Sequence, residues 1–423
     1  MPIPSLPSEK RNIGSIGEPA YRFIDWLEKA GQKYWQILPT THPDGTSPYT
    51  AFSAFAGNPL LIDLNILKDE GLIKEIPTLD HYEPKIDYDS VEKLHMESLR
   101  EAFKNVTSDM IIEMLAFKES ENWIEDYALF MAYRDYNSKK PLWEMDIDLR
   151  MRKKETMLKY SIILSTEINF YIFIQYVFYK QWHKLKEYAH QHKVEIIGDM
   201  PIYVSLNSAD AWSHPELFKF DNDFNPTVVA GCPPDPYAKK GQLWGNPVYD
   251  WNYHRKTSYQ WWVARVKHEL EMFDVLRIDH FRGFDRYWEI PSNEETAING
   301  KWVDGPKMEL FEAIKREIPN ARIIAEDLGK IDDGVRDLLR ETGYPGMKVM
   351  IFGLTEDNEH TPCNWPENCI GYTSTHDSAP IRVEIEELSE ERRKILNIST
   401  DIEQAGMSVL RAVYASKDRK SVV

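Results

Sequence analysis

Short apolar runs alternate with longer segments of helical periodicity along most of the chain. The apolar runs predict buried strands at 34–38, 58–64, 194–197, 275–278, 322–325, 347–351 and 370–373. The helical periodicity predicts helices at 20–30, 167–192, 257–272, 307–317 and 331–342. This alternation of short strands and helices indicates the α/β class.

Residues 66–165 break this alternation, because they are rich in charge, helical in pattern and poor in glycine. We expect a mainly helical insertion there, within a single catalytic domain that spans residues 1–423. The most apolar window, 160–182, is interrupted by Glu167, Asn169 and Lys180. A membrane span needs roughly 20 residues with few polar breaks, so this window predicts a buried helix and no membrane partner.

The order of strands and helices favours a parallel (β/α)8 barrel of the TIM type, and a doubly wound sheet fits it nearly as well. The positions of acidic residues distinguish them, because the catalytic groups of a barrel lie at the carboxyl ends of several different strands. Asp279 and Glu326 directly follow predicted strands, and Asp377 comes just after a third. One or two β/α units separate each from the next, so a closed barrel would bring all three together.

Such a set of carboxylates suits the cleavage of glycosidic bonds. One carboxylate attacks the anomeric carbon, and a second, held protonated, gives its proton to the leaving oxygen. Arg277 lies two residues before Asp279, so on a strand both side chains point the same way, and the cation favours an ionised Asp279. The alternative for any one acid is a helix N-cap. Three acids together, with His280 and His376 beside them, favour a site.

Composition narrows the class of partner. The net charge of −17 opposes binding to nucleic acid, and the aromatic content of 12% suits stacking on sugar rings or simply an aromatic core. No glycine-rich nucleotide motif, P-loop or Cys/His ligand spacing is present, so we expect no cofactor and no metal. The cysteine spacing and the absence of a secretory signal predict a cytoplasmic protein. The sequence specifies no oligomeric state.

The segment Arg277-Ile-Asp-His-Phe-Arg-Gly-Phe284 resembles the amylomaltases, the 4-alpha-glucanotransferases of the alpha-amylase clan. The resemblance extends from about Pro4 to Ser416, and the order of its motifs makes it specific. The other matching motifs lie at 34–39, 47–49, 53–59, 198–204, 208–212, 229–235, 241–247, 325–329 and 375–377.

This resemblance implies a (β/α)8 fold and a retaining transfer of alpha-1,4-glucan segments between maltooligosaccharide donors and acceptors. It implies that Asp279 is the nucleophile, that Glu326 is the general acid/base and that Asp377 stabilises the transition state. The remaining residues that it places at the sugar sites are Arg277, His376, Tyr49, Asp199, Gln242, Trp244 and His280. For Tyr49, Trp244 and His280 a packing role is the alternative.

The chain departs from the family pattern in several respects, two of which bear directly on the fold and the site. Thr46 stands where the family has an aspartate before Ser-Pro-Tyr, which weakens the expected acceptor contacts near Tyr49. The family also continues through an apolar strand near the point where this chain ends at Val423. We therefore expect a barrel truncated before its last strand and helix. Two other functions stay open, an alpha-glucan hydrolase of the same clan and an inactive, truncated glucan-binding homologue.

Overall fold

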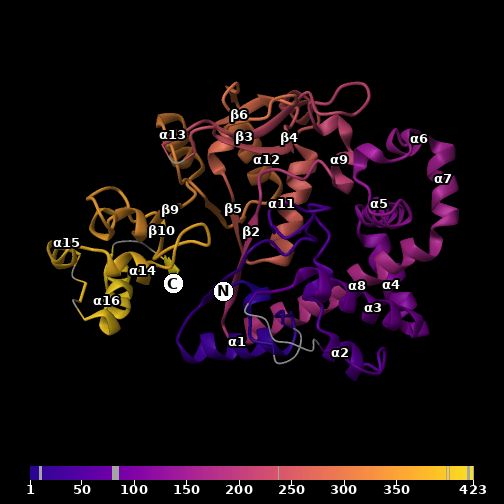
Figure 1. Cartoon of the computed structure of the whole chain (residues 1–423), viewed down its shortest axis with the longest axis horizontal. Helices are drawn as coiled ribbons and strands as arrows, with labels where there is room; N and C mark the ends of the chain where they lie inside the picture. Colours follow the sequence, from indigo (N-terminus) through magenta and orange to yellow (C-terminus); the bar gives the residue numbers. More distant parts are fainter. Residues whose placement is uncertain are drawn as a thin grey trace. The chain divides into compact units, whose positions relative to one another are not determined.

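The computed structural model describes residues 1–8, 12–78, 85–236, 238–396, 398–399, 401–416 and 420–422. The chain divides into two compact units (Figure 1). The first unit comprises Met1–Leu276 and Arg286–Ala321, and the second comprises Arg277–Asp285 and Arg322–Val423.

Most α-helices of the first unit come before its second strand. The α-helices of this unit are α1 (Glu18–Lys29), α2 (Leu64–Asp69), α3 (Tyr88–Lys104), α4 (Ser108–Ser120), α5 (Ile124–Tyr136), α6 (Ile147–Arg150), α7 (Lys154–Ile163), α8 (Ser165–Gln191), α9 (Ala209–Ser213), α10 (Trp251–Lys256), α11 (Gln260–Met272) and α12 (Met308–Glu317). The strands are β1 (Tyr34–Gln36), β2 (Glu195–Met200), β3 (Val228–Cys232), β4 (Gln242–Pro247), the start of β5 (Val275–Ile278), β6 (Arg286–Pro291) and β7 (Lys301–Asp304).

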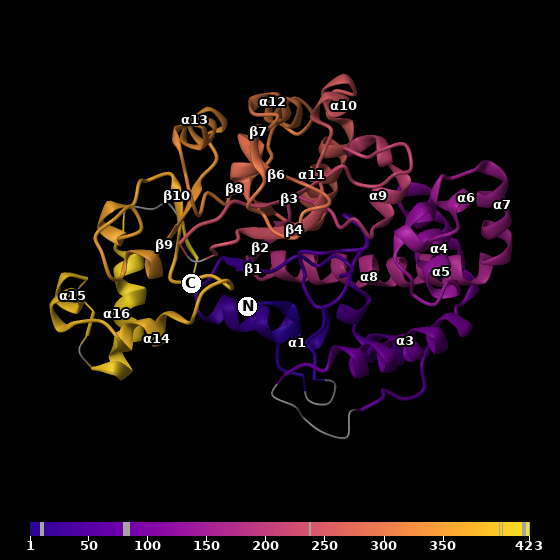
Figure 2. The same ribbon diagram turned by 45° about the horizontal axis from the view of Figure 1, so that its top comes forward.

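Strands β1 and β2 pair in parallel, with Trp35 opposite Ile196, and β5 follows β2 in the strand order. Helices α1 and α8 pack together beside these strands (Figure 2). Helix α1 buries Ala20, Ile24 and Leu27, whose spacing places them on one helical face. The predicted β/α alternation therefore holds in this part of the chain.

The strand predicted at 58–64 is wrong. Pro59 begins a short 3-10 helix, Pro59–Leu61, and the side chain of Asn58 caps it by accepting the N–H of Leu60 at 3.0 Å. Asp63 then caps α2 by accepting the N–H of Asn65 at 2.7 Å. Two capping side chains and a proline at a first helical position override the apolar pattern.

The first unit also contains an antiparallel sheet of order β4-β3-β6-β7, which the sequence pattern did not predict. In it Ala230 of β3 lies opposite Glu289 of β6, and Trp288 of β6 lies opposite Trp302 of β7. Strand β4 forms the edge of this sheet beside β3.

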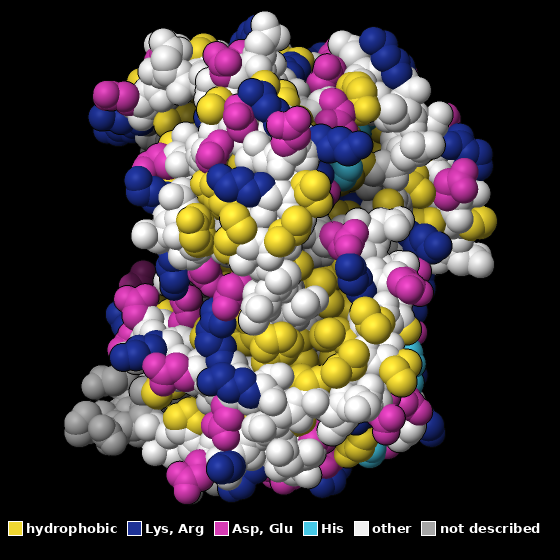
Figure 3. All heavy atoms as spheres, turned by 90° about the vertical axis from the view of Figure 1, so that its right-hand side faces the viewer, with side chains coloured by type: hydrophobic (Ala, Val, Ile, Leu, Met, Phe, Trp, Pro, Cys, Tyr) yellow, Lys and Arg dark blue, Asp and Glu magenta, His cyan; other side chains and the backbone are white. Residues whose placement is uncertain are grey.

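The segment expected to be a helical insertion contains α2 to α7. Figure 3 looks onto the side of the first unit that bears these helices, where hydrophobic side chains gather among charged ones. The window predicted as a buried helix lies mostly in α8, whose residues 170–179 are all buried. No single helix in the described ranges is long and apolar enough to cross a membrane. Only together do α7 and α8 reach that length and apolar composition, and they are bent by 79° relative to each other.

The second unit begins with the end of β5, which lies next to β8. Its other elements are β8 (Ile323–Ala325), α13 (Asp333–Thr342), β9 (Gly346–Val349), β10 (Cys369–Tyr372), α14 (Ile381–Glu386), α15 (Glu390–Ile395), α16 (Ile402–Tyr414) and β11 (Lys420–Val422). Strand β10 pairs in parallel with both β9 and β11. We expected no strand after β10, so β11 corrects that expectation: at least three residues of a further strand are present.

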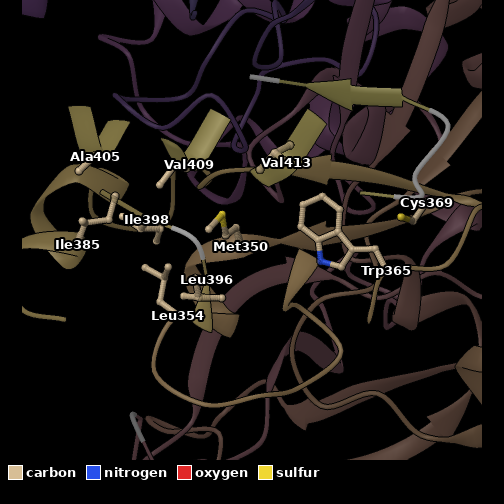
Figure 4. Close-up of a cluster of buried hydrophobic side chains, with 10 residues drawn as sticks. All are labelled: Met350, Leu354, Trp365, Cys369, Ile385, Leu396, Ile398, Ala405, Val409 and Val413. Atoms are coloured by element: carbon tan, nitrogen blue, oxygen red, sulfur yellow. The ribbon is translucent and has the colours of Figure 1, made fainter. Parts of the chain in front are cut away.

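A hydrophobic cluster forms the core beside β10 (Figure 4). It joins the strand region to the helices near the carboxyl end of the chain through Met350, Leu354, Trp365, Cys369, Ile385, Leu396, Ile398, Ala405, Val409 and Val413. Trp365 also packs against Gly371 of β10, where a Cβ would meet its ring at 2.3 Å. The cluster therefore supports the strand that leads to Asp377.

Candidate functional site

Asp279 and Glu326 follow the ends of neighbouring strands, as the sequence predicted. Asp279 comes directly after β5, and Glu326 comes directly after β8. The N–H of Glu326 donates to the carbonyl of Ile278 at 3.0 Å, and the N–H of Phe281 donates to the carbonyl of Glu326 at 3.0 Å. The backbone on both sides of Asp279 is thus tied to Glu326, which brings the two acids together.

Arg277 forms an ion pair with Asp279, with Nη2 3.0 Å from Oδ1. The prediction from strand alternation, that these two side chains point the same way, is therefore confirmed. The Arg277 side chain is only 4% exposed, whereas that of Asp279 is 28% exposed. A buried cation beside a partly accessible carboxylate favours the ionised form of that carboxylate.

The carboxyl group of Glu326 is held by two backbone N–H groups. His280 N–H donates to Oε2 at 2.7 Å, and Leu328 N–H donates to Oε1 at 3.0 Å. Burial and the negative charge of Asp279 raise the pKa of Glu326 to about 8, against the opposing effects of Arg277 and the two N–H groups. Glu326 is therefore mostly protonated at neutral pH and can donate a proton.

His280 adopts a left-handed backbone conformation, with φ of 49°. This conformation is uncommon for residues other than glycine, and it turns the N–H of His280 toward Glu326. Burial and the positive charge of Arg282 lower the pKa of His280 to about 4, so its imidazole is neutral at pH 7. The backbone N–H of His280 thus contacts Glu326, and a sugar contact of its side chain stays a prediction.

Asp377 and His376 form a second group, on the loop after β10. His376 Nε2 lies 3.4 Å from Asp377 Oδ1, and the N–H of Asp377 donates to Thr375 Oγ1 at 3.3 Å. The side chain of Asp377 is 77% exposed. The described contacts of Asp377 are thus local, in contrast to the contacts that join Glu326 to the end of β5.

Four predicted sugar-site residues lie in the first unit and form two pairs. Tyr49 Oη donates to Asp199 Oδ2 at 2.7 Å, and Asp199 is buried in β2. On β4, Trp244 Nε1 donates to Gln242 Oε1 at 3.0 Å, near the exposed end of that strand. The ring of Trp244 also packs near the ring of Tyr203, with 6.2 Å between their centroids. Each pair is preformed within this unit.

Two features of the site have no signal in the sequence. The first is the pair of backbone N–H groups on Glu326, because any residue type supplies an N–H. The second is Met347, whose sulfur lies 3.4 Å from Nε of Arg277. Met347 belongs to β9 and resembles an ordinary core methionine in the sequence, so its neighbour is visible only in the folded structure.

The chain is similar to known proteins over its whole length. A family model described as 4-alpha-glucanotransferase matches residues 1–420. The chain is 43% identical over 440 residues to a 4-alpha-glucanotransferase of Clostridium butyricum, covering 100% of this chain and 89% of that protein. It is 43% identical over 429 residues to a 4-alpha-glucanotransferase of Aquifex aeolicus, covering 100% of this chain and 88% of that protein.

Two solved structures are similar to the whole chain. An amylomaltase from Streptococcus agalactiae in complex with acarbose has a TM-score of 0.95 at 40% identity, covering 100% of this chain and 88% of that one. An amylomaltase from Corynebacterium glutamicum, at 19% identity and a TM-score of 0.72, covers 97% of this chain and 60% of that one and supports the fold. The predicted α/β fold of the TIM-barrel type is confirmed. The chain belongs to the 4-alpha-glucanotransferase family.

Proposed function

We propose that this chain transfers alpha-1,4-glucan segments from a donor maltooligosaccharide to the 4-hydroxyl of an acceptor sugar by double displacement. The observation that supports this proposal best is the arrangement around β5 and β8. There Arg277 neutralises Asp279, while the neighbouring Glu326 keeps its proton at neutral pH. One acid is prepared to attack and the other to donate, as a retaining mechanism requires.

In the first step a carboxylate oxygen of Asp279 attacks the anomeric carbon of the donor. The bond from that carbon to the glycosidic oxygen breaks, and the Glu326 proton moves to that oxygen as the shortened glucan leaves. The product is a glycosyl ester on Asp279 beside an ionised Glu326. Arg277 neutralises Asp279 before the attack and loses that ion pair as the ester forms.

In the second step Glu326 acts as the base. It removes the proton from the 4-hydroxyl of an acceptor sugar, whose oxygen attacks the anomeric carbon and displaces Asp279. Both displacements invert the anomeric carbon, so the alpha configuration is retained. Asp377 would stabilise the positive charge that develops on the sugar ring, and the neighbouring His376 would contact the donor sugar.

The other predicted sugar contacts are part of the same proposal. Tyr49 and Asp199 offer a hydroxyl and a carboxylate that can bind sugar hydroxyls, and Trp244 offers an aromatic face held by Gln242. The side chain of His280, neutral at pH 7, can accept or donate a hydrogen bond. The similarity to an amylomaltase that binds acarbose supports a sugar ligand.

The experiment is incubation of the 423-residue chain with maltotriose, with products separated by size and free glucose measured. We expect a ladder of longer maltodextrins together with glucose, lost in Asp279→Asn and retained in Asp304→Asn. Asp304 is a matched control because its carboxylate makes an exposed ion pair with Arg286. Glucose and maltose without longer products would instead identify a hydrolase. A folded chain without turnover would contradict the proposal.

We also propose a cytoplasmic location, because no disulfide joins Cys232, Cys363 and Cys369, as is usual in a reducing compartment. Fractionation of the source cells should recover the activity in the cleared lysate. Recovery in the culture medium would contradict this location.

A further inference from the structure

Asp327, directly after Glu326, points to a different neighbour. Its Oδ1 accepts the N–H of Met347 at 2.6 Å, whereas Oε2 of Glu326 accepts the N–H of His280. Opposite orientation of adjacent side chains is the expected geometry of extended backbone. Asp327 is only 8% exposed, so this carboxyl is a buried group with a specific backbone partner. The dipeptide 326–327 thus joins the end of β5 to the start of β9.

Gly346 allows this contact to form. A Cβ at position 346 would lie 2.6 Å from Oδ2 of Asp327 and 2.8 Å from its Oδ1, closer than real Cβ atoms approach. The N–H of Ala325 also donates to the carbonyl of Pro345 at 2.9 Å. The backbone around the start of β9 is therefore hydrogen-bonded to Ala325 and to Asp327, the residues on either side of Glu326.

Met347 extends this connection to the ion pair. Its side chain is 1% exposed, and its sulfur lies 3.4 Å from Nε of Arg277. Through Nη2 the same guanidinium contacts Asp279 at 3.0 Å. Because a guanidinium is planar and rigid, a contact at Nε constrains where Nη2 points. A continuous series of contacts thus runs from Asp327 through Met347 and Arg277 to Asp279.

We propose that Asp327 and Met347 are positioning residues that hold Arg277 against Asp279. Asp327 fixes the backbone of Met347, and the Met347 sulfur fixes the guanidinium. The thioether suits this place, because its polarisable sulfur is a weak acceptor for the Nε–H of the buried cation, whereas an alkyl side chain accepts no hydrogen bond. This inference rests on the proposed function, since it concerns the residues assigned there to nucleophilic attack and proton transfer.

The charges around Asp327 are consistent with a structural carboxyl that the reaction does not use. Burial raises the pKa of Asp327, and the positive charge of Lys348 opposes this effect. Lys348 is itself paired with Glu359, with 2.8 Å between Nζ and Oε2. Asp327 is therefore balanced by its own neighbours on β9 and the following loop.

Met347→Leu is the first test, with Met350→Leu as its matched control. Both replacements keep a buried apolar side chain of similar volume, and such exchanges are the ones that a packed core tolerates best. Met350 belongs to the hydrophobic cluster beside β10, so its replacement perturbs packing in the same unit. We expect kcat of Met347→Leu to fall about tenfold, since small misplacements of reacting groups have effects up to about a hundredfold. KM should change much less.

The pH profile separates positioning from packing. Arg277 lowers the pKa of Glu326, so a guanidinium that has moved away should shift the alkaline limb of kcat/KM to higher pH in Met347→Leu. Gly346→Ala should produce the same two changes, because its Cβ displaces the Asp327 carboxyl without touching Arg277. Asp327→Asn, which keeps an acceptor oxygen for the Met347 N–H, should retain most activity, whereas Asp327→Leu should resemble Met347→Leu.

The double variant Asp327→Leu with Met347→Leu should be little worse than either single variant, because residues acting in series are not additive. Thermal unfolding of each variant identifies any that fail to fold, and Gly346→Ala tests the same series if Met347→Leu is one of them. A Met347→Leu enzyme with the rate and pH profile of Met350→Leu would overturn this inference. Asp279→Asn is assayed in parallel as a test of the proposed function itself. If Asp279→Asn remains active, the proposed function has failed; if it is inactive while Met347→Leu behaves like Met350→Leu, only the positioning role has failed.

Discussion

The two groups of acidic residues in the second unit differ in how firmly the fold holds them. Glu326 accepts two backbone N–H groups, and its own backbone bonds to the residues on both sides of Asp279. Asp377 is 77% exposed and contacts its neighbours in the loop after β10. Preorganised groups need no rearrangement during the reaction, whereas an exposed loop acquires its working geometry when the substrate binds.

This difference has a physical origin in the residues that follow the two strands. Strands β8 and β10 both have neighbours on two sides. The residues directly after β8 bond to the backbone of both of its neighbours: Glu326 bonds at the end of β5, and Asp327 bonds to Met347 in β9. The loop after β10 is held instead by a turn in which the Ser378 hydroxyl accepts the N–H of Thr375 at 3.1 Å. The comparison predicts that substitutions in the first group act on chemistry, while those in the second act through substrate contacts.

The largest effect is expected from Glu326→Gln. It keeps the shape of the side chain and removes the proton donor, so turnover of maltotriose should fall roughly a thousandfold, within the usual range for general acid–base catalysis. With an alpha-maltosyl fluoride donor, whose leaving group needs no proton, the first step should persist. Quenched-flow measurement of fluoride should then show a stoichiometric burst followed by slow release. Near-normal turnover of maltotriose would remove Glu326 from the proposed mechanism.

A smaller loss, roughly a hundredfold in kcat, is expected for Asp377→Asn, in line with removal of one group that stabilises a transition state. The midpoint of thermal unfolding should stay unchanged, because an exposed side chain contributes little to stability. Asp333→Asn is the control, since Asp333 is fully exposed at the start of α13 in the same unit. If Asp377→Asn behaves like this control, Asp377 has no part in catalysis, and the expected difference between the two groups of acids is contradicted.

The sequence predicted the strands that position both groups, and it failed where side chains override the pattern. The apolar runs before Asp279 and Glu326 are buried on both faces, so periodicity and flanking acids located them. The prediction for the run 58–64 was wrong because Asn58 and Asp63 cap helices and Pro59 begins one. The antiparallel sheet of β3, β4, β6 and β7 was missed, since its short strands follow no β/α repeat.

At the site itself, strand alternation predicted the pairing of Arg277 with Asp279. This pairing could be predicted because the two residues lie two positions apart along one strand. The raised pKa of Glu326 depends on burial and on a charge from another strand, and the contact of Met347 with Arg277 depends on the placement of β9. Such properties arise from tertiary packing, and one sequence does not encode them in any local pattern.

The smallest predicted effect is a pH dependence that belongs to the first group of acids alone. The pKa of Glu326 is raised from 4.5 to about 8, so kcat/KM should be level at neutral pH and fall about tenfold per pH unit above 8 as the donor loses its proton. The free energy of unfolding should also decrease as pH rises. Between about pH 4.5 and 8 the folded state holds a proton that the unfolded state has released, so the free energy of unfolding decreases as pH rises through this window.

Initial rates of maltotriose disproportionation from about pH 5 to 10 would measure the alkaline fall in kcat/KM. Urea unfolding over the same range would measure the free energy of unfolding. This range is roughly the one over which a group with this pKa titrates. Asp377→Asn should show the same alkaline limb at a lower rate, because burial and Asp279 are the causes that raise the pKa of Glu326. Glu326→Gln should lose the limb and flatten the decline in stability. A limb displaced by a full pH unit in Asp377→Asn would mean that its charge acts on Glu326, so that the two groups form one electrostatic unit.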